Sequence, residues 1–285
     1  MRIAMGVDWS DQAFAAVTQT LHAYRPTDVT LVHGVDLGMF QYPIVAQAAN
    51  LQGYDEFRNA MVDAGRQLLD RAAAMIPADV GNVRRVNEIG SPAQIILNAA
   101  QTVAADLVVV GARGRSRVTE VVLGSVSHRV LMHASCSTLI VKGNARPIQQ
   151  VLVAIEGRED AGRIKKWLLT NPFKNPVALS VLTVVQPIRM ADPANIVGFQ
   201  AWVDTATTYA EDLVKETGAG LMNSHYTVST RVATGEPAAI VAEHAKAMDL
   251  VVVASHGRKG TERFLLGSVS HSIVHQVACP ILVVR

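Results

Sequence analysis

Residues 107–128 read LVVVGARGRSRVTEVVLGSVSH, and residues 250–271 read LVVVASHGRKGTERFLLGSVSH. The two stretches lie 143 positions apart and share an apolar run at the start and Leu-Gly-Ser-Val-Ser-His at the end. A pattern this long, repeated at one period, indicates a duplicated unit. Because there are two copies and the period is far above 50 residues, the duplication is of a whole domain and not of a solenoid repeat.

The length of the chain agrees with this duplication. At roughly 150 residues per domain, 285 residues are enough for two domains. We expect the first domain at residues 1–143 and the second at residues 149–285. The junction Gly143–Gln149 holds Gly, Asn and Pro, which are typical of a break between structured units.

Short apolar runs alternate with segments of helical spacing in both repeats. The predicted strands of the first repeat are Arg2–Val7, Val29–Val35, Val83–Ile89, Leu107–Val110 and Thr138–Val141, and its predicted helices are Asp11–Tyr24, Tyr54–Met75, Ala93–Val103 and Ser125–Ala134. The predicted strands of the second are Val151–Ile155, Leu179–Val185, Thr227–Ala233, Leu250–Ala254 and Ile281–Val284, and its predicted helices are Ala161–Leu169, Val197–Thr217, Ala238–Met248 and Ser268–Val277. Continuous Val, Ile and Leu runs between helices predict an α/β fold with a parallel sheet covered on both faces.

Composition and charge exclude several classes of protein. The net charge is +2, from 26 basic and 24 acidic residues without a basic run, and aromatic residues make up 5%, so we expect no nucleic-acid partner. The apolar runs are far shorter than the ~20 residues of a membrane-spanning helix, so we expect no membrane partner. Two cysteines do not make a disulfide framework, and we expect a reduced, cytoplasmic location.

A group of glycines follows the fourth predicted strand. Gly111 and Gly114 come directly after that strand, and Gly124 and Ser125 open the next predicted helix. Glycines allow backbone N–H groups to approach an anion, and the start of a helix adds unpaired N–H donors, so this order suits phosphate binding. Taken singly, these residues would be read as turn glycines and a helix cap. Their occurrence together after a buried strand favours a binding site.

Two further side chains near these glycines carry suitable chemistry. Ser127 adds a hydroxyl donor to the first turn of the helix. Arg113 would neutralise part of the charge of a bound phosphate, although exposed loop arginines are common.

The spacing Gly111-x2-Gly114-x9-Gly124-Ser125 resembles the ATP-binding signature of the universal stress protein family. Nearly the whole chain takes part in the resemblance, as two tandem copies. The other matching features are Asp8 at the end of the first strand, Gly90 and Pro92 before the third helix, and the apolar last strand Thr138–Val141. The resemblance implies two tandem Rossmann-like domains, each with a five-stranded parallel sheet, and a role in stress response or signalling.

The resemblance also implies roles for individual residues. Asp8 would contact the adenine or the ribose, and the backbone near Gly34 and Val35 would line the adenine pocket. The ribose and phosphates would be held by Gly111, Gly114, Gly124 and Ser125, with Arg113 and Ser127 beside them. For Asp8, a purely structural role in a turn or helix cap is an equal alternative. The expected ligand is ATP, with Mg²⁺ as an optional companion because no carboxylate cage is evident.

The second repeat departs from this pattern at two positions. Ala254 stands where the first glycine is expected, and Glu156 stands where the first repeat has Asp8. Gly257, Gly267 and Ser268 are retained. We therefore expect the first domain to bind the nucleotide and the second to be a weaker or empty site.

No catalytic constellation is evident in the sequence. Neither Gly-x-Ser-x-Gly nor Gly-x-x-x-x-Gly-Lys-Ser/Thr occurs, so we expect a binding protein and not an enzyme. Slow ATP hydrolysis or phosphotransfer, and a nucleotide-free interaction scaffold, remain the alternatives. His271 and His275 have metal-ligand spacing on one predicted helix, but no Cys or carboxylate accompanies them, and we expect no metal.

The last predicted strand of each repeat is short and apolar. In the family that the chain resembles, this strand makes dimers. We therefore expect the two domains of one chain to associate as an internal pseudo-dimer, with a homodimer of the chain as a further step.

Overall fold

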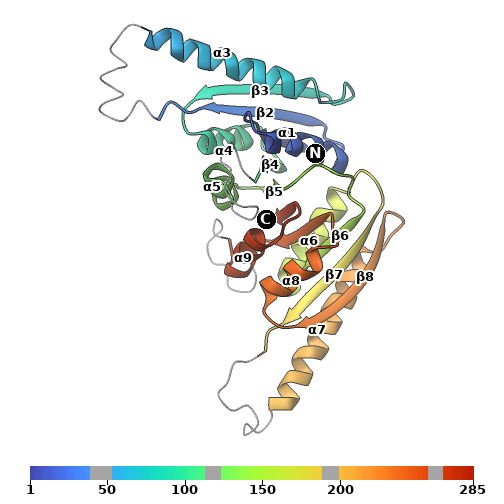
Figure 1. Ribbon diagram of the computed structural model, residues 1–285. Coiled ribbons are helices and arrows are strands. Elements are labelled where there is room, and N and C mark those ends of the chain that lie inside the picture. Colours follow the sequence, from blue (N-terminus) through green and yellow to red (C-terminus); the bar gives the residue numbers. More distant parts are fainter. Residues whose placement is uncertain (39–52, 113–122, 188–198, 256–265) are drawn as a thin grey trace. The chain divides into compact units, whose positions relative to one another are not determined.

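The computed structural model describes residues 1–38, 53–112, 123–187, 199–255 and 266–285, and these form two compact units (Figure 1). The units are Met1–Ala145 and Arg146–Arg285. Both are α/β units in which parallel strands alternate with helices along the chain, as the sequence predicts. The boundary between them falls inside the segment that is rich in Gly, Asn and Pro.

The described part of the first unit contains a parallel sheet with the order β3-β2-β1-β4-β5. The chain runs outward from β1 to β3 and then returns to the other side of β1 as β4. The carboxyl ends of β1 and β4 therefore flank the switch point of the strand order, where open α/β sheets bind ligands. The elements are β1 (Arg2–Gly6), α1 (Asp11–Ala23), β2 (Asp28–Val35), α3 (Tyr54–Ala73), β3 (Asn82–Ile89), α4 (Pro92–Thr102), β4 (Leu107–Gly111), α5 (Ser125–His133) and β5 (Ser137–Val141).

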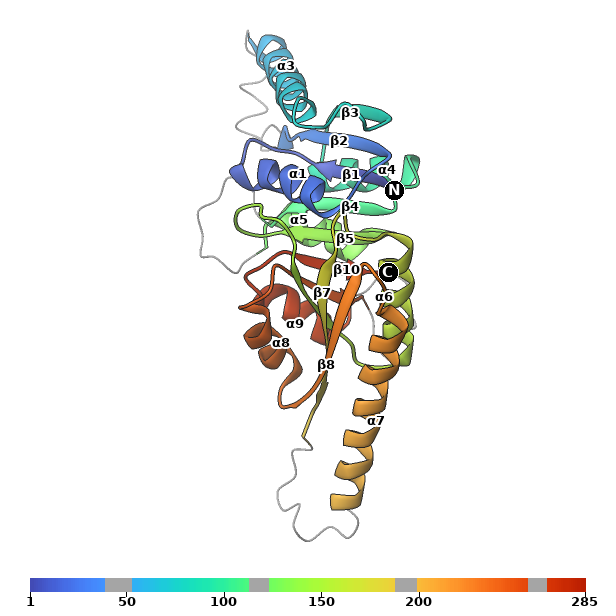
Figure 2. The same cartoon turned by 90° about the vertical axis from the view of Figure 1, so that its right-hand side faces the viewer.

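Helices cover both faces of this sheet (Figures 1 and 2). On one face, α1 packs on β4 and β5 while α3 packs on β2 and β3, and the guanidinium of Arg71 on α3 lies 4.4 Å from the ring centre of Phe14 on α1. On the other face, α4 packs on β1 and β2 and contacts α5. A central strand such as Leu107–Gly111 is thus buried from both sides, which explains its unbroken apolar sequence.

The second unit repeats this arrangement with the strand order β10-β9-β6-β7-β8, again parallel. On one face, α6 packs on β9 and β10, and α7 packs on β7 and β8. Helix α8 packs on β6 and β7 and contacts α9. The elements are β6 (Gln150–Ala154), α6 (Arg158–Thr170), β7 (Val177–Val185), α7 (Phe199–Leu221), β8 (Tyr226–Thr234), α8 (Pro237–Ala245), β9 (Leu250–Ala254), α9 (Ser268–Gln276) and β10 (Ile281–Val284).

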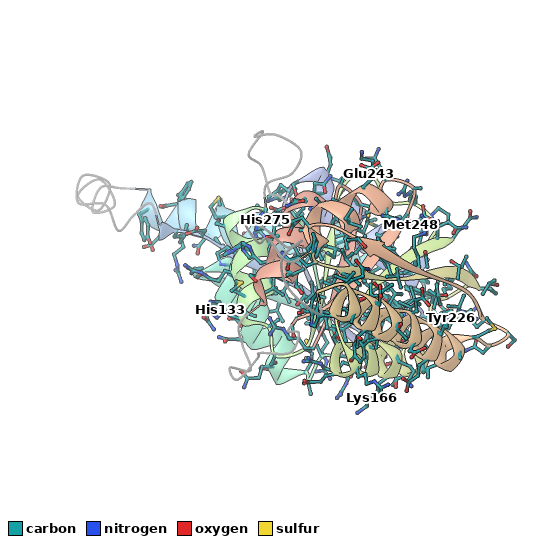
Figure 3. All side chains as sticks on the ribbon, turned by 90° about the horizontal axis from the view of Figure 1, so that it is seen from below. His133, Lys166, Tyr226, Glu243, Met248 and His275 are labelled. Atoms are coloured by element: carbon teal, nitrogen blue, oxygen red, sulfur yellow. The ribbon has the colours of Figure 1, made fainter. Side chains whose placement is uncertain are left out.

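A buried tyrosine anchors the start of β8 in the second unit (labelled in Figure 3). The hydroxyl of Tyr226 donates to the carbonyl of Leu168 at 2.9 Å and accepts from the backbone N–H of Phe173 at 3.4 Å. Burial raises the pKa of Tyr226 to about 12. The side chain therefore belongs to the core as a neutral, hydrogen-bonded group.

Helix α3 is buried along only part of its apolar side. The helical spacing of residues 54–75 places Phe57, Met61, Leu68, Leu69 and Ala72 on one side. Leu68, Leu69 and Ala72 are buried, whereas Phe57 and Met61 are 42% and 36% exposed. Helical spacing identifies a common stripe, but burial also needs a neighbouring element over every turn of the helix.

The start of α6 differs from the sequence prediction. This helix begins at Arg158 and not near Ala161, as the sequence predicts. The carboxylate of Asp160 accepts the backbone N–H groups of Glu156 at 2.6 Å and Gly157 at 2.7 Å. An acidic residue at the third helical position that reaches back in this way stabilises an earlier helix start.

No helix within the described residues combines the length and the apolar character that crossing a membrane requires.

Candidate functional site

A cavity of about 270 Å³ lies at the carboxyl end of the sheet in the first unit. Its walls come from the ends of β1, β2 and β4, the segment after β1, the start of α4 and the first turn of α5. This is the switch point between β1 and β4. Six of the predicted site residues line it: Asp8, Gly34, Gly111, Gly124, Ser125 and Ser127.

The start of α5 presents unpaired backbone donors to the cavity. Gly124 is the N-cap residue, with φ −68° and ψ 159°, and no side chain caps the helix. The first amide to bond back along the helix is that of His128, which donates to the Gly124 carbonyl at 2.9 Å. The first-turn N–H groups of Ser125, Val126 and Ser127 therefore lack helical partners, and an anion would satisfy them.

Three glycines let the elements around the cavity approach one another closely. A Cβ on Gly34 would lie 2.5 Å from Cα of Pro92, at the start of α4. A Cβ on Gly111 would lie 2.9 Å from the backbone of Gln12, at the start of α1, and a Cβ on Gly6 would lie 2.6 Å from Ile96. The wall of the cavity is therefore built from bare backbone at these positions, which suits a ligand that packs flat against it.

Asp8 has a structural role that the structure shows directly. Its Oδ1 accepts the backbone N–H of Ser10 at 2.9 Å and also the Ser10 hydroxyl. Ser10 in turn is the N-cap of α1, and its Oγ accepts the N–H of Ala13 at 3.2 Å. Asp8 also lines the cavity, so its contact with a ligand stays a prediction beside the turn role.

Ser127 ties the first turn of α5 to the end of β4. Its Oγ donates to the carbonyl oxygen of Gly111 at 2.6 Å, and its side chain is buried. The hydroxyl hydrogen is directed at this carbonyl and not into the cavity. The structure therefore supports Ser127 as a residue that positions the loop, while its direct contact with phosphate stays a prediction.

His33 lines the cavity but is absent from the predicted site. Its Nδ1 lies 2.8 Å from the carbonyl oxygen of Val7, directly after the neighbouring strand β1. In the neutral ring, a proton on Nδ1 would donate to this carbonyl and leave Nε2 as an acceptor. A single histidine within a strand gives no sequence signal that marks it as part of a site.

The remaining predicted site residues lie elsewhere. Val35 follows Gly34 on β2 but is buried and does not line the cavity. Arg113, Gly114 and Gly257 lie outside the described residues. Gly267 and Ser268 form the N-cap and the first residue of α9 in the second unit, and Ser268 likewise begins a helix without a side-chain cap.

The second unit has its own cavity in the matching position, and its volume is about 720 Å³. It lies at the carboxyl ends of β6, β7 and β9 and is bounded by α7, the start of α8 and α9. Glu156 and Ala254, which replace the Asp and the Gly of the first unit, both line it. Asp160 also lines it, and burial raises the pKa of that carboxyl despite the backbone N–H groups that it accepts.

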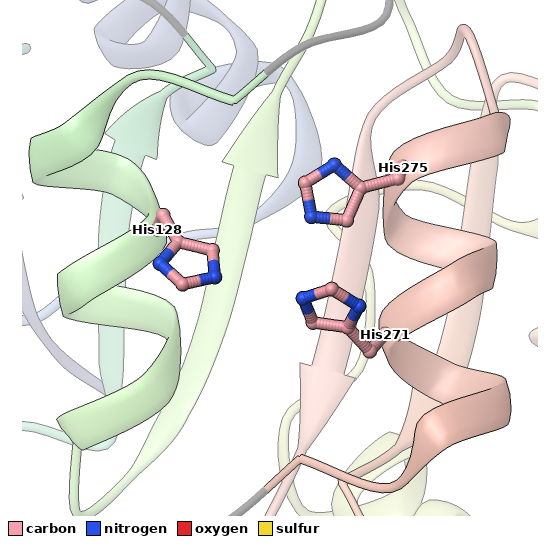
Figure 4. Close-up of side chains that lie close together, drawn as sticks. All are labelled: His128, His271 and His275. Atoms are coloured by element: carbon pink, nitrogen blue, oxygen red, sulfur yellow. The ribbon is translucent and has the colours of Figure 1, made fainter.

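Figure 4 shows the histidines for which the sequence spacing suggests metal binding. His271 and His275 lie one turn apart on α9, with ring centres 4.5 Å apart, and His128 lies on α5. The absence of a metal stays a prediction.

The model of the universal stress protein family matches residues 1–142 and again residues 147–285. The chain belongs to the universal stress protein family. It is a tandem member, because each half matches the family model separately and both halves have the same order of strands.

Curated relatives extend over the whole of this universal stress protein. A universal stress protein of Mycobacterium tuberculosis (strain ATCC 25618 / H37Rv) is 25% identical over 297 residues, covering 99% of this chain and 96% of the relative. A universal stress protein of Bacillus subtilis (strain 168) is 38% identical over 151 residues, which is 50% of this chain and 98% of the relative. The chain is thus similar both to two-domain relatives and to a relative half its length.

A solved structure shares the fold. The crystal structure of a universal stress protein from Archaeoglobus fulgidus DSM 4304 superposes with a TM-score of 0.63 and 17% identity, covering 100% of this chain and 96% of that one. This likeness supports the α/β fold of the universal stress protein.

Proposed function

We propose that this universal stress protein binds ATP through its first domain and acts in stress response or signalling. The observation that carries the proposal is the start of α5, where the amides of Ser125, Val126 and Ser127, which have no partner within the helix, line a cavity at the β1/β4 switch point. Helix starts of this kind favour phosphate groups, because the N–H donors and the positive end of the helix dipole act together.

The volume of the cavity suits part of a nucleotide. Its volume of about 270 Å³ is slightly below the roughly 300–1,000 Å³ of small-molecule sites. The adenine would lie against the ends of β1 and β2 near Asp8 and Gly34, where a Cβ at Gly34 would already collide with Pro92. The ribose and phosphates would extend past Gly111 toward Gly124 and Ser125.

The proposal includes binding without fast turnover. Among the described residues that line the cavity, Asp8 is the single carboxylate, and its Oδ1 is engaged in the turn before α1. Efficient phosphoryl transfer needs a positioned base or a metal-held water. Mg²⁺ would arrive on the phosphates of ATP and not in a protein cage. Steady release of phosphate from Mg-ATP, lost on substitution of Ser125, would support the slow-enzyme alternative instead.

The other parts of the proposal concern partners and location. Association of the two domains through their last strands stays a prediction. A homodimer of the chain is a second prediction, which sedimentation velocity of the purified chain tests. Neither Cys136 nor Cys279 forms a disulfide, which agrees with the proposed reduced, cytoplasmic location.

The sharpest test removes one amide donor without removing the helix. Ser125→Pro deletes the N–H at the first helical position, where proline is favoured, and the φ and ψ of Gly124 suit a following proline. Loss of one hydrogen bond to a charged phosphate costs about 1.5–3 kcal/mol, so we expect ATP affinity in isothermal titration calorimetry to fall by roughly 10–100-fold.

Ser268→Pro is the matched control in the second domain. Its N-cap residue Gly267 has φ −60° and ψ 149°, so proline is equally compatible there. We expect this variant to bind ATP like the unaltered chain. Unchanged affinity in Ser125→Pro, or an equal loss in both variants, contradicts the assignment to the first domain. Mass spectrometry of nucleotide released from the denatured chain identifies the bound species.

A further inference from the structure

We propose that the cavity of the second domain binds a neutral, largely apolar small molecule and not a nucleotide. This inference is independent of the function proposed for the first domain. It rests on the size of the cavity, the apolar stripe of α7, the hydrogen bonds of three polar side chains in its wall to the backbone, and its acidic residues.

The size of the cavity is that of a small-molecule site. Its volume of about 720 Å³ lies within the roughly 300–1,000 Å³ typical of such sites, whereas the equivalent cavity in the first domain measures about 270 Å³. Both lie at the carboxyl ends of the corresponding strands. The duplicated fold has therefore acquired a larger space at the same place in its second copy.

Helix α7 forms one wall of this space. The buried residues Ala210, Leu213, Val214 and Thr217 of α7 correspond, at a constant offset of 145 positions, to the buried residues Gly65, Leu68, Leu69 and Ala72 of α3. At the same offset, Ala206 stands where α3 has Met61. A methyl group thus replaces a long side chain, and Ala206 lines the cavity.

The same face of α7 offers aromatic surface to a ligand. Trp202 and Tyr209 line the cavity and are 48% and 39% exposed, while Leu213 further along the stripe is buried. Two exposed aromatic rings seven residues apart lie on one side of a helix. Aromatic and aliphatic walls of this kind are typical of sites for apolar ligands.

Three polar side chains in the wall, those of Thr183, Ser270 and Asp160, are bonded to backbone groups of the protein. Thr183 Oγ1 donates to the carbonyl of Ile155 at 2.8 Å, and Ser270 Oγ donates to the carbonyl of Ala254 at 2.7 Å. Both carboxylate oxygens of Asp160 accept backbone N–H groups. These side chains therefore keep their own partners when an apolar molecule enters, so its binding leaves no donor or acceptor of theirs unsatisfied.

Charge in the cavity opposes a nucleotide. Glu156 and Asp160 both line it, whereas Asp8 is the single carboxylate among the described residues that line the cavity of the first domain. Two carboxylates in one wall repel phosphate groups, and the repulsion strengthens as water is excluded. The α9 start still offers amide donors, which suit a carbonyl or hydroxyl oxygen on a neutral ligand.

The test uses the full chain and the neutral fluorescent probe N-phenyl-1-naphthylamine, whose emission rises in apolar surroundings. We expect saturable binding at one site per chain. Ala206→Phe fills the cavity from α7, and we expect it to weaken binding at least about tenfold. Ala206→Met, which installs the side chain found at the equivalent position of α3, should weaken it less.

Ala201→Phe is the matched control, because Ala201 is exposed on the same helix and does not line the cavity. We expect the probe to bind this variant as it binds the unaltered chain. ATP at concentrations that saturate the first domain should leave the probe bound. The absence of saturable binding, equal affinity in Ala206→Phe, or displacement of the probe by ATP would overturn the proposal. Circular dichroism of each variant establishes that the helices are retained.

Discussion

The Ser127 hydroxyl donates to the carbonyl oxygen of Gly111 at 2.6 Å, and this bond joins the first turn of α5 to the end of β4. The second domain repeats it, since Ser270 donates to the carbonyl of Ala254 at 2.7 Å. The bond is thus retained even where the glycine has been replaced. It fixes the position of a helix start relative to a strand end in both copies of the fold.

Ser127→Ala should destabilise the first domain by about 1–3 kcal/mol, because the partly buried Gly111 carbonyl loses this donor. Urea unfolding followed by the fluorescence of Trp9 measures this, in a chain whose Trp167 and Trp202 are replaced by Phe. Ser125→Ala is the control, since Ser125 is exposed and does not cap α5, and we expect a change within about 0.5 kcal/mol. Equal effects of the two substitutions would contradict the structural role of Ser127.

Gly34→Ala should destabilise the first domain by about 1–3 kcal/mol, because the new Cβ would lie 2.5 Å from the Cα of Pro92 and force α4 away from β2. Gly162→Ala is the opposite case. Gly162 lies within α6, and a Cβ there meets nothing within 4 Å, so alanine should stabilise the second domain by about 0.5–1 kcal/mol. Urea unfolding of both variants checks the two signs, and a stabilised Gly34→Ala chain would contradict the close approach of α4.

Alkaline pH should destabilise the second domain through Tyr226. Burial raises its pKa to about 12, above the ordinary value of 10.0, so the folded state favours the neutral phenol. The stabilisation is complete below pH 10 and is lost as pH rises toward 12. Spectrophotometric titration of the phenolate should show one late-titrating tyrosine that is absent from Tyr226→Phe. A chain whose tyrosines all titrate near pH 10 before unfolding would contradict this.

Asp249 should stabilise the start of the second domain. Its Oδ2 accepts the backbone N–H groups of Gln149 and Gln150 at 2.9 Å each, and its Oδ1 pairs with Arg146 at 3.2 Å. Asp249→Ala removes an acceptor from two amides and should cost about 1.5–3 kcal/mol in urea unfolding. Asp249→Asn keeps one oxygen acceptor and should cost less. Equal losses would show that charge, and not hydrogen bonding, is what matters here.

The sequence predicts the elements of the fold closely, because each buried strand is an unbroken apolar run between helical segments. The structure confirms the first and last residues of two predicted strands, Leu250–Ala254 and Ile281–Val284. The predicted start of α6 is wrong because the Asp160 carboxylate accepts a backbone N–H from before the helix. The spacing of apolar residues gives no sign of such a bond. The exposure of Phe57 shows the same limit, since covering one turn of a helix depends on a distant element.

The candidate site could be predicted in part. Glycine spacing located Gly111, Gly124 and Ser125 at the switch point, because turns and helix starts have local sequence signals. His33 could not be located in this way, since its place in the wall depends on the neighbouring strand. The cavity of the second domain could not be foreseen either, because its volume depends on the distance between α7 and the sheet.

The two ends of the junction are bonded within their own domains. On one side, Gln12 Nε2 donates to the carbonyl of Gly143 at 3.3 Å; on the other, Arg146 donates to the carbonyl of Met248 at 2.7 Å. Only Asn144 and Ala145 lie between these anchors. Proteases cleave segments whose backbone can unfold locally and extend, so we expect the initial proteolytic cleavage to fall outside this junction. Limited proteolysis would then open the chain elsewhere before releasing either half, and separate halves are better obtained by expressing each one from its own start codon.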